Sequence, residues 1–123
     1  MSNSKFKNVY TMIGPDAKIH GPINLDQGII IYGKVIGDII TNSSVRIAKE
    51  GIVEGNVKCS DIVLGGTVKG HIESEGSVTL KSSSKLKGDI KYRKLHIEDG
   101  AQFEGQCDML IESVKSNTFN LLS

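Results

Sequence analysis

The sequence is poor in the residues on which several common classes of protein depend. It has no Trp, only 5% aromatic residues, and only two cysteines, Cys59 and Cys107. Because these cysteines form no CxxC motif and no cluster with histidine, the sequence predicts neither a structural zinc site nor a disulfide framework. Even its long apolar runs, such as Ile29–Ile31, are far shorter than the roughly 20 residues that cross a bilayer as a helix.

Charge and motifs exclude further classes. The formal net charge is +1 and 24% of the residues are charged, a balance that does not favour nucleic-acid binding. No GxxxxGK[ST] loop occurs, so we expect neither a nucleotide nor another cofactor, and no catalytic residues. The histidines fall at different positions of the repeat described below, which argues against a metal site; they are His20, His71 and His96. Residues 1–12 lack the apolar core of a signal peptide, so we expect a cytoplasmic protein.

Glycine, in contrast, occurs fourteen times and recurs at a regular spacing. It is the fifth residue of a unit that reads small, any, apolar, any, Gly, any, apolar. Six copies begin at residues 17, 33, 51, 66, 84 and 101, and their central glycines are Gly21, Gly37, Gly55, Gly70, Gly88 and Gly105. Successive central glycines lie 15 to 18 residues apart, which gives a repeat period of about 17 residues.

An apolar-x-apolar pair lies between successive copies, as in Val45-Arg46-Ile47. Apolar residues two apart, most of them Val and Ile, are typical of strands and not of helices. The period is too short for a propeller blade or a helical repeat. The sequence therefore predicts an all-β, single-domain parallel β-helix, or β-solenoid, of about six stacked rungs.

The central glycine explains how so small a coil can close. The small residue, both apolar residues and the glycine share one parity, so a straight strand would point all of them inward and would be too long for one face. Glycine permits the necessary bend because it has no Cβ and tolerates positive φ. The alternative is that the glycines form hairpin turns in an antiparallel sheet, but Asn-Gly and Asp-Gly are absent from the units, and Asp99-Gly100 stands alone.

The repeat resembles the bactofilin family of bacterial cytoskeletal proteins. The resemblance rests on the steps Gly37–Ile39 and Gly88–Ile90, the opening segment Ile13–Gly21 and the closing segment Leu95–Met109. It implies a right-handed β-helix, which we expect at residues 13–112, between a flexible N-terminal arm, 1–12, and a short flexible tail, 113–123. It also implies filaments that form without nucleotide and act as a scaffold in cell shape or morphogenesis. The implied partners are further copies of the chain, the inner membrane surface, and cell-wall or morphogenesis proteins.

The two ends of such a rod are candidate polymerisation interfaces. Unpaired strand edges can template pairing with another chain, and no capping helix is predicted at either end. The expected contact residues are Phe103, Cys107, Met109, Leu110 and Ile111 at the C-terminal end, and Ile13, Ile19, Ile23 and Leu25 at the N-terminal end. We expect Phe103 either to contribute most to this contact or to fill the last turn of the core. Cys107 and Cys59 have inward parity and are expected to be buried thiols.

Three further surfaces are candidates. Ile30, Ile36 and Ile40 are expected to point outward near the second rung, as a lateral patch for bundling or membrane contact unless the arm covers them. Lys5, Phe6 and Lys7 of the arm are candidates for membrane contact. Residues 81–94 carry six basic side chains and one acidic one, which form either a lipid-binding or a solvated face.

Two other classes of β-helix compete with the scaffold interpretation. A left-handed β-helix enzyme, such as a trimeric acyltransferase or carbonic anhydrase, needs an aliphatic residue every six positions, and the irregular rungs contain no such hexad. A monomeric binding solenoid of the ice-binding type needs a regular threonine ladder, which the five threonines do not form. We therefore expect a structural protein and not an enzyme.

Overall fold

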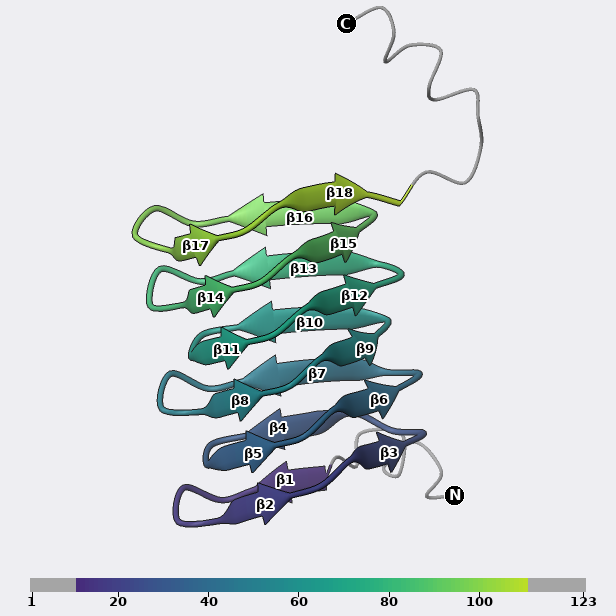
Figure 1. Ribbon diagram of the computed structural model, residues 1–123, viewed down its shortest axis with the longest axis vertical. Coiled ribbons are helices and arrows are strands. Elements are labelled where there is room, and N and C mark those ends of the chain that lie inside the picture. The colour runs from purple at the N-terminus through teal and green to yellow at the C-terminus, as the bar shows by residue number, and fades with distance from the viewer. Residues whose placement is uncertain (1–10, 111–123) are drawn as a thin grey trace, which may run out of the picture.

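The structure, a computed structural model, describes residues 11–110, which form short strands and turns without a helix. Eighteen strands wind as a right-handed coil of six rungs, three strands to a rung (Figure 1). The predicted all-β parallel solenoid is confirmed, and its hand is opposite to that of the enzyme class considered as an alternative. The first strand begins at Thr11, whereas the boundaries expected for the arm and the tail stay predictions.

Equivalent strands of successive rungs pair in parallel and form three six-stranded sheets. Sheet A contains β1 (Thr11–Ile13), β4 (Ile29–Ile31), β7 (Ser44–Ile47), β10 (Asp61–Leu64), β13 (Ser77–Leu80) and β16 (Lys94–Ile97). Sheet B contains β2 (Lys18–His20), β5 (Lys34–Ile36), β8 (Ile52–Glu54), β11 (Thr67–Lys69), β14 (Lys85–Lys87) and β17 (Gln102–Glu104). Sheet C contains β3 (Ile23–Leu25), β6 (Ile39–Thr41), β9 (Val57–Cys59), β12 (Ile72–Ser74), β15 (Ile90–Tyr92) and β18 (Cys107–Met109).

The core consists of columns in which each inward side chain stacks on its equivalent one rung away. In sheet A, Val45 pairs with Ile62 and Ile62 pairs with Val78, and all three are buried. Since neighbouring strands lie about 4.8 Å apart, each rung covers the apolar side chains of the rung before it. A rung without a neighbour cannot bury its own inward side chains, so stability comes from stacking.

The six central glycines all have positive φ, between +104° and +155°, a backbone conformation that residues with a Cβ rarely adopt. Five of them also lie directly against the backbone of the preceding rung. At Gly70 (φ +151°), an added Cβ would overlap the carbonyl oxygen of Gly55. The glycine column therefore lets the chain bend between sheets B and C while the rungs stay at strand spacing.

Two buried hydroxyl groups fasten the corner between sheets C and A. Thr41 Oγ1 donates to the Gln27 carbonyl oxygen at 2.8 Å and accepts from the Ser43 N–H at 3.1 Å. Two rungs further along the rod, Ser74 Oγ donates to the Ser60 carbonyl oxygen at 2.6 Å. Each hydroxyl bonds to the preceding rung, so buried polar groups reinforce the same stacking as the apolar columns.

Candidate functional site

Among the described residues, 11–110, no strand covers the core at the C-terminal end of the rod. Ile97 on β16 stacks on Leu80, yet its side chain is 46% exposed, whereas Leu80 is 0% exposed. Met109 on β18 is 53% exposed. These side chains occupy inward positions, and they are exposed because β16, β17 and β18 each have a neighbouring strand on one side only.

The residues predicted for this end differ in their exposure. Phe103 stacks on Leu86 and is partly buried against the core, and Leu110, just after β18, is also partly buried. Ile111 lies outside the described residues. Cys107 is exposed, so the prediction of a buried thiol is wrong for this residue. It does stack on Ile90 in an apolar column, but no described rung covers it from the other side.

The N-terminal end is more enclosed. Ile13 on β1 is only 6% exposed, and the other three predicted residues, Ile19, Ile23 and Leu25, are partly buried against the core. Strands β1, β2 and β3 again pair on one side only. Phe103, Cys107 and Met109 and the four predicted N-terminal residues therefore lie at inward positions of edge strands, although Ile13 offers little surface to another chain.

Sequence reasoning missed two residues of the C-terminal end, Leu95 and Ile97 on β16. Both belong to the last apolar-x-apolar pair of the repeat, Leu95-His96-Ile97, and are absent from the contact residues expected at this end. The signal was available in the sequence, because no further pair follows Leu95-His96-Ile97 at the distance of one period.

The two thiols have different surroundings, and both disfavour the thiolate. Cys59 is buried, as predicted, and burial together with the nearby Asp61 carboxylate raises its pKa to about 12. The pKa of the Cys107 thiol is also raised, by partial desolvation and by Asp108. Neither cysteine is therefore activated as a nucleophile at neutral pH.

The three isoleucines expected to form one lateral patch are on different sheets. Ile30 is on β4 of sheet A, Ile36 on β5 of sheet B, and Ile40 on β6 of sheet C. Ile40 is 42% exposed, and the other two are partly buried. They point outward from one rung in separate directions, so they do not form a continuous surface.

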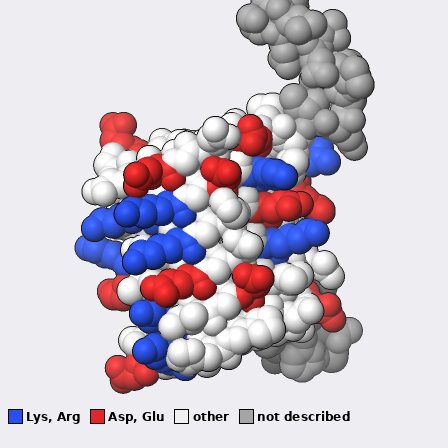
Figure 2. Space-filling view, in the orientation of Figure 1, with Lys and Arg blue, Asp and Glu red and all other residues white. Residues whose placement is uncertain are grey.

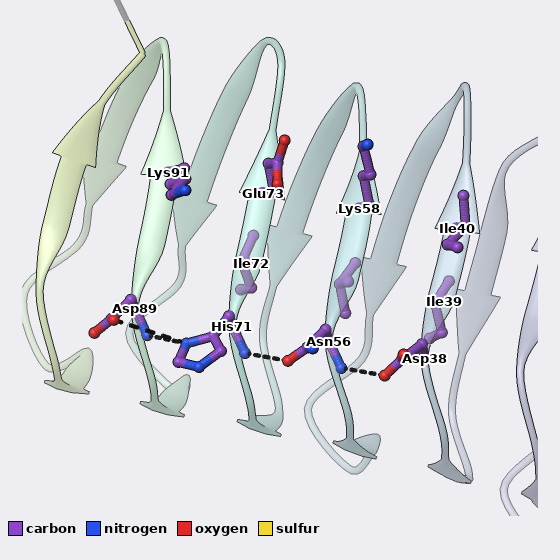
Figure 3. A pocket seen from close by; sticks show the side chains of 11 residues that line it. Asp38, Ile39, Ile40, Asn56, Lys58, His71, Ile72, Glu73, Asp89 and Lys91 are labelled. Carbon is purple, nitrogen blue, oxygen red and sulfur yellow. Dashed lines mark hydrogen bonds and ion pairs between the residues drawn. The ribbon is translucent and has the colours of Figure 1, made fainter.

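A ladder of polar side chains follows the central glycines along the edge of sheet C. In rungs two to five, the residue after the central glycine accepts a hydrogen bond from the backbone N–H of its equivalent in the next rung (Figure 3). The bonds run from Asn56 N to Asp38 Oδ1 (2.9 Å), His71 N to Asn56 Oδ1 (3.0 Å), Asp89 N to His71 Nδ1 (3.0 Å) and Gln106 N to Asp89 Oδ1 (3.1 Å). In the first rung this position is Pro22, which has no N–H to satisfy.

A shallow hollow of about 450 Å³ lies between this ladder and a second row of side chains on the outer face of sheet C. Figure 3 shows Ile40, Lys58, Glu73 and Lys91 in that row, one from each successive strand. Lysine and acid alternate from rung to rung, so the hollow is lined by charges of both signs.

On the face drawn in Figure 2, basic and acidic side chains form alternating bands across the rod. The basic residues of 81–94 extend over all three sheets: Lys85 and Lys87 lie on β14, Lys91 on β15 and Lys94 on β16. Acidic residues of the last rung pair with them, as in Lys81–Glu98 (3.4 Å) and Lys87–Glu104 (3.9 Å). The basic segment therefore encircles the rod and is partly neutralised by the next rung.

The part of the chain that the structure describes has no group of three His, Cys, Asp or Glu side chains that could hold a metal ion. His20 and His96 lie on β2 and β16, apart from the ladder that contains His71. Within residues 11–110 there is no helix long and apolar enough to cross a membrane. The candidates for membrane contact, Lys5, Phe6 and Lys7, lie outside these residues.

The fold is a parallel β-solenoid, and comparison with known proteins identifies its family. The family described as Bactofilin, polymer-forming cytoskeletal, matches residues 11–108. Bactofilin BacO of Myxococcus xanthus (strain DK1622) is 35% identical over 99 residues, which cover 80% of this chain and 79% of BacO. Bactofilin BacP of the same organism is 31% identical over 99 residues, 80% of this chain but 41% of BacP. The chain belongs to the bactofilin family of polymer-forming cytoskeletal proteins. No solved structure matches it.

Proposed function

We propose that the rods stack end to end into a filament that serves as a cytoskeletal scaffold in cell shape or morphogenesis. The observation that carries this proposal is the open core at the C-terminal end, where Ile97 is 46% exposed one rung above a fully buried Leu80. A rung from a second copy would cover Ile97, Met109 and Phe103 as each rung covers the one before it within the chain. Because such contact leaves a free end, repetition gives an open filament.

The free energy available from this contact is moderate for each side chain. Full burial of an isoleucine or methionine contributes about 1.5–3 kcal/mol, so a side chain that is half exposed has roughly 1 kcal/mol left to gain. Several such side chains act together, and the edge strands add backbone hydrogen bonds. The contact uses only side chains and strand edges of the chain itself, so we propose that it needs no nucleotide.

Negative-stain electron microscopy of the purified chain in buffer without nucleotide tests the proposal. We expect filaments from the wild type and their loss in Ile97→Lys and Phe103→Arg, which place a charge in the covered core. Ile40→Lys is the matched control, because Ile40 is 42% exposed but points outward from the side of the rod. Filaments in Ile97→Lys, or a wild type that stays a small closed oligomer at high concentration, would contradict the end-to-end contact.

We further propose that the filament contacts the inner face of the membrane through Lys5, Phe6 and Lys7. One basic residue near an anionic surface contributes only about 1 kcal/mol, but a filament repeats the contact many times. Flotation with anionic vesicles should recover the wild type and not Lys5→Glu/Phe6→Ser/Lys7→Glu. Equal flotation of both would refute the contact, whatever the state of the filaments.

A further inference from the structure

The outer face of sheet C carries a column in which the sign of the charge alternates from rung to rung. Its members are Lys58 on β9, Glu73 on β12, Lys91 on β15 and Asp108 on β18. The strand register aligns each with the next: Lys58 with Glu73, Glu73 with Lys91, and Lys91 with Asp108. The column therefore covers four successive rungs with the order plus, minus, plus, minus.

These four side chains have their charges available to another molecule. Lys58, Lys91 and Asp108 are exposed, and Glu73 is partly exposed. Ion pairs within the chain occur elsewhere, at Lys34–Glu54, Lys81–Glu98 and Lys87–Glu104. Among the described residues, none of the four forms an ion pair of this kind. The ladder beside them places His71 and Asp89 in the same two central rungs as Glu73 and Lys91 (Figure 3).

We propose that this face pairs laterally with the same face of a second, antiparallel copy of the chain. A two-fold axis that lies in the interface, parallel to the strands and midway between Glu73 and Lys91, reverses the order of the column. Lys58 then faces Asp108 of the second copy, and Glu73 faces Lys91 of the second copy, so all four contacts join opposite charges. In the adjacent row, the same operation places His71 opposite Asp89. The interface is isologous, because one surface supplies both sides.

The other two sheets do not have this property. On sheet B, the corresponding outward column is Glu54, Lys69, Lys87 and Glu104, and its reversal places acid against acid and lysine against lysine. On sheet A, the outward column is mostly uncharged, with Met12, Ile30, Val63 and Thr79 beside Arg46 and His96. A parallel, in-register pair of sheet C faces would bring each charge against itself. Charge complementarity therefore selects sheet C and the antiparallel direction.

A single pair of rods would bind weakly through this face. An exposed ion pair contributes little to binding, and a four-rung strip is roughly 20 Å long, so it buries far less than the roughly 800 Å² per partner of a stable complex. Lateral pairing thus rests on the proposed filament, which repeats the strip along its length and adds the contributions. Because the contact is electrostatic and exposed, salt should weaken it.

Electron microscopy of filaments at low and high salt tests the pairing with three variants. Lys91→Glu creates like charges at the two central contacts, so we expect single filaments where the wild type forms bundles at low salt. Lys87→Glu is the matched control, since it makes the same change in the same rung but on sheet B, and bundles should persist. The double variant E73K/K91E restores opposite charges at the antiparallel contacts, and we expect bundles to return. Circular dichroism checks that each variant is folded.

The outcomes separate this inference from the proposed function. Wild-type bundles that dissolve in salt, are lost in Lys91→Glu and return in E73K/K91E support the antiparallel face. Filaments that bundle equally in Lys91→Glu and the wild type, or that do not bundle at low salt at all, overturn the lateral face and leave end-to-end assembly intact. Failure of E73K/K91E to restore bundles overturns the antiparallel order. A wild type without filaments contradicts the proposed function and removes the basis of the pairing with it.

Discussion

In rungs two to six, the central glycine satisfies two independent requirements at once. The backbone needs positive φ to bend between sheets B and C, and the preceding rung leaves no room for a Cβ. A residue that met only one of these requirements would still be excluded by the other. The spacing of these glycines therefore predicts both the period and the corner, and both are confirmed.

Gly70→Ala should consequently be strongly destabilising. The added Cβ would overlap the Gly55 carbonyl oxygen while φ stays near +151°, and we expect a loss of at least roughly 2 kcal/mol in the free energy of unfolding. Gly14→Ala is the control, because a Cβ there meets nothing within 4 Å and φ is not positive. Urea unfolding followed by circular dichroism measures both. Equal midpoints for the two variants would contradict the steric argument.

Residue parity predicts whether a side chain points inward, but not whether another rung covers it. Cys59 and Cys107 both lie at inward positions of sheet C, in different columns, and only Cys59 is buried. The difference arises because Cys107 is in the last described rung. Parity also does not distinguish the three sheets, which is why Ile30, Ile36 and Ile40 looked like neighbours in the sequence.

At the scale of strands and turns, rungs two to six are linked by side chains that accept backbone N–H groups of the following rung. The ladder from Asp38 to Gln106 was not predicted, because the position after the glycine was treated as unrestricted. Its occupants in rungs two to six are Asp, Asn, His, Asp and Gln, all of them able to accept a hydrogen bond. The physical signal was present in the sequence, but it becomes meaningful only when the parallel register places these residues above one another.

Glu98 also links two rungs, at the turn after β16, and its ionisation makes the stability of the fold depend on pH. The Ser82 N–H bonds to its carboxylate at 3.0 Å, and with Lys81 this lowers the pKa of Glu98 below its ordinary value of 4.5. The folded state therefore favours the ionised form, so its stabilisation is fully present above pH 4.5 and is lost as the pH falls through the lowered value. Glu98→Gln should be less stable than the wild type at neutral pH, and the difference should vanish in acid.

Thermal unfolding by circular dichroism across this pH range measures the difference. Asp99→Asn removes the same charge from the adjacent residue, which lacks the cross-rung hydrogen bond, and should show little pH-dependent change relative to the wild type. A Glu98→Gln variant whose stability deficit is independent of pH would show that the carboxylate charge is irrelevant to this turn.

At the scale of the whole molecule, the C-terminal end carries an exposed cysteine whose reactivity can show whether that end is covered. Cys107 is exposed in the last rung, whereas Cys59 is buried. In alkaline buffer, which offsets the raised pKa of Cys107, one thiol per chain should react with Ellman's reagent in the unassembled Ile97→Lys variant. In wild-type filaments the reaction should be strongly slowed, because a second copy covers the last rung. Equal rates in the two samples would mean that the C-terminal end stays open.

The open last rung also connects how the chain folds with how it assembles. Each rung contacts only its neighbours, so protection of backbone amides from hydrogen exchange should be greatest in the middle rungs and fall toward the C-terminal end. The terminal rung of a free chain is then the part that opens most often. Arrival of another copy would cover it by the same contact that ordered every earlier rung. In the proposed filament, the contact that covers the last rung of one chain would be of the same kind as the contact that stacks each rung on its neighbour within the chain.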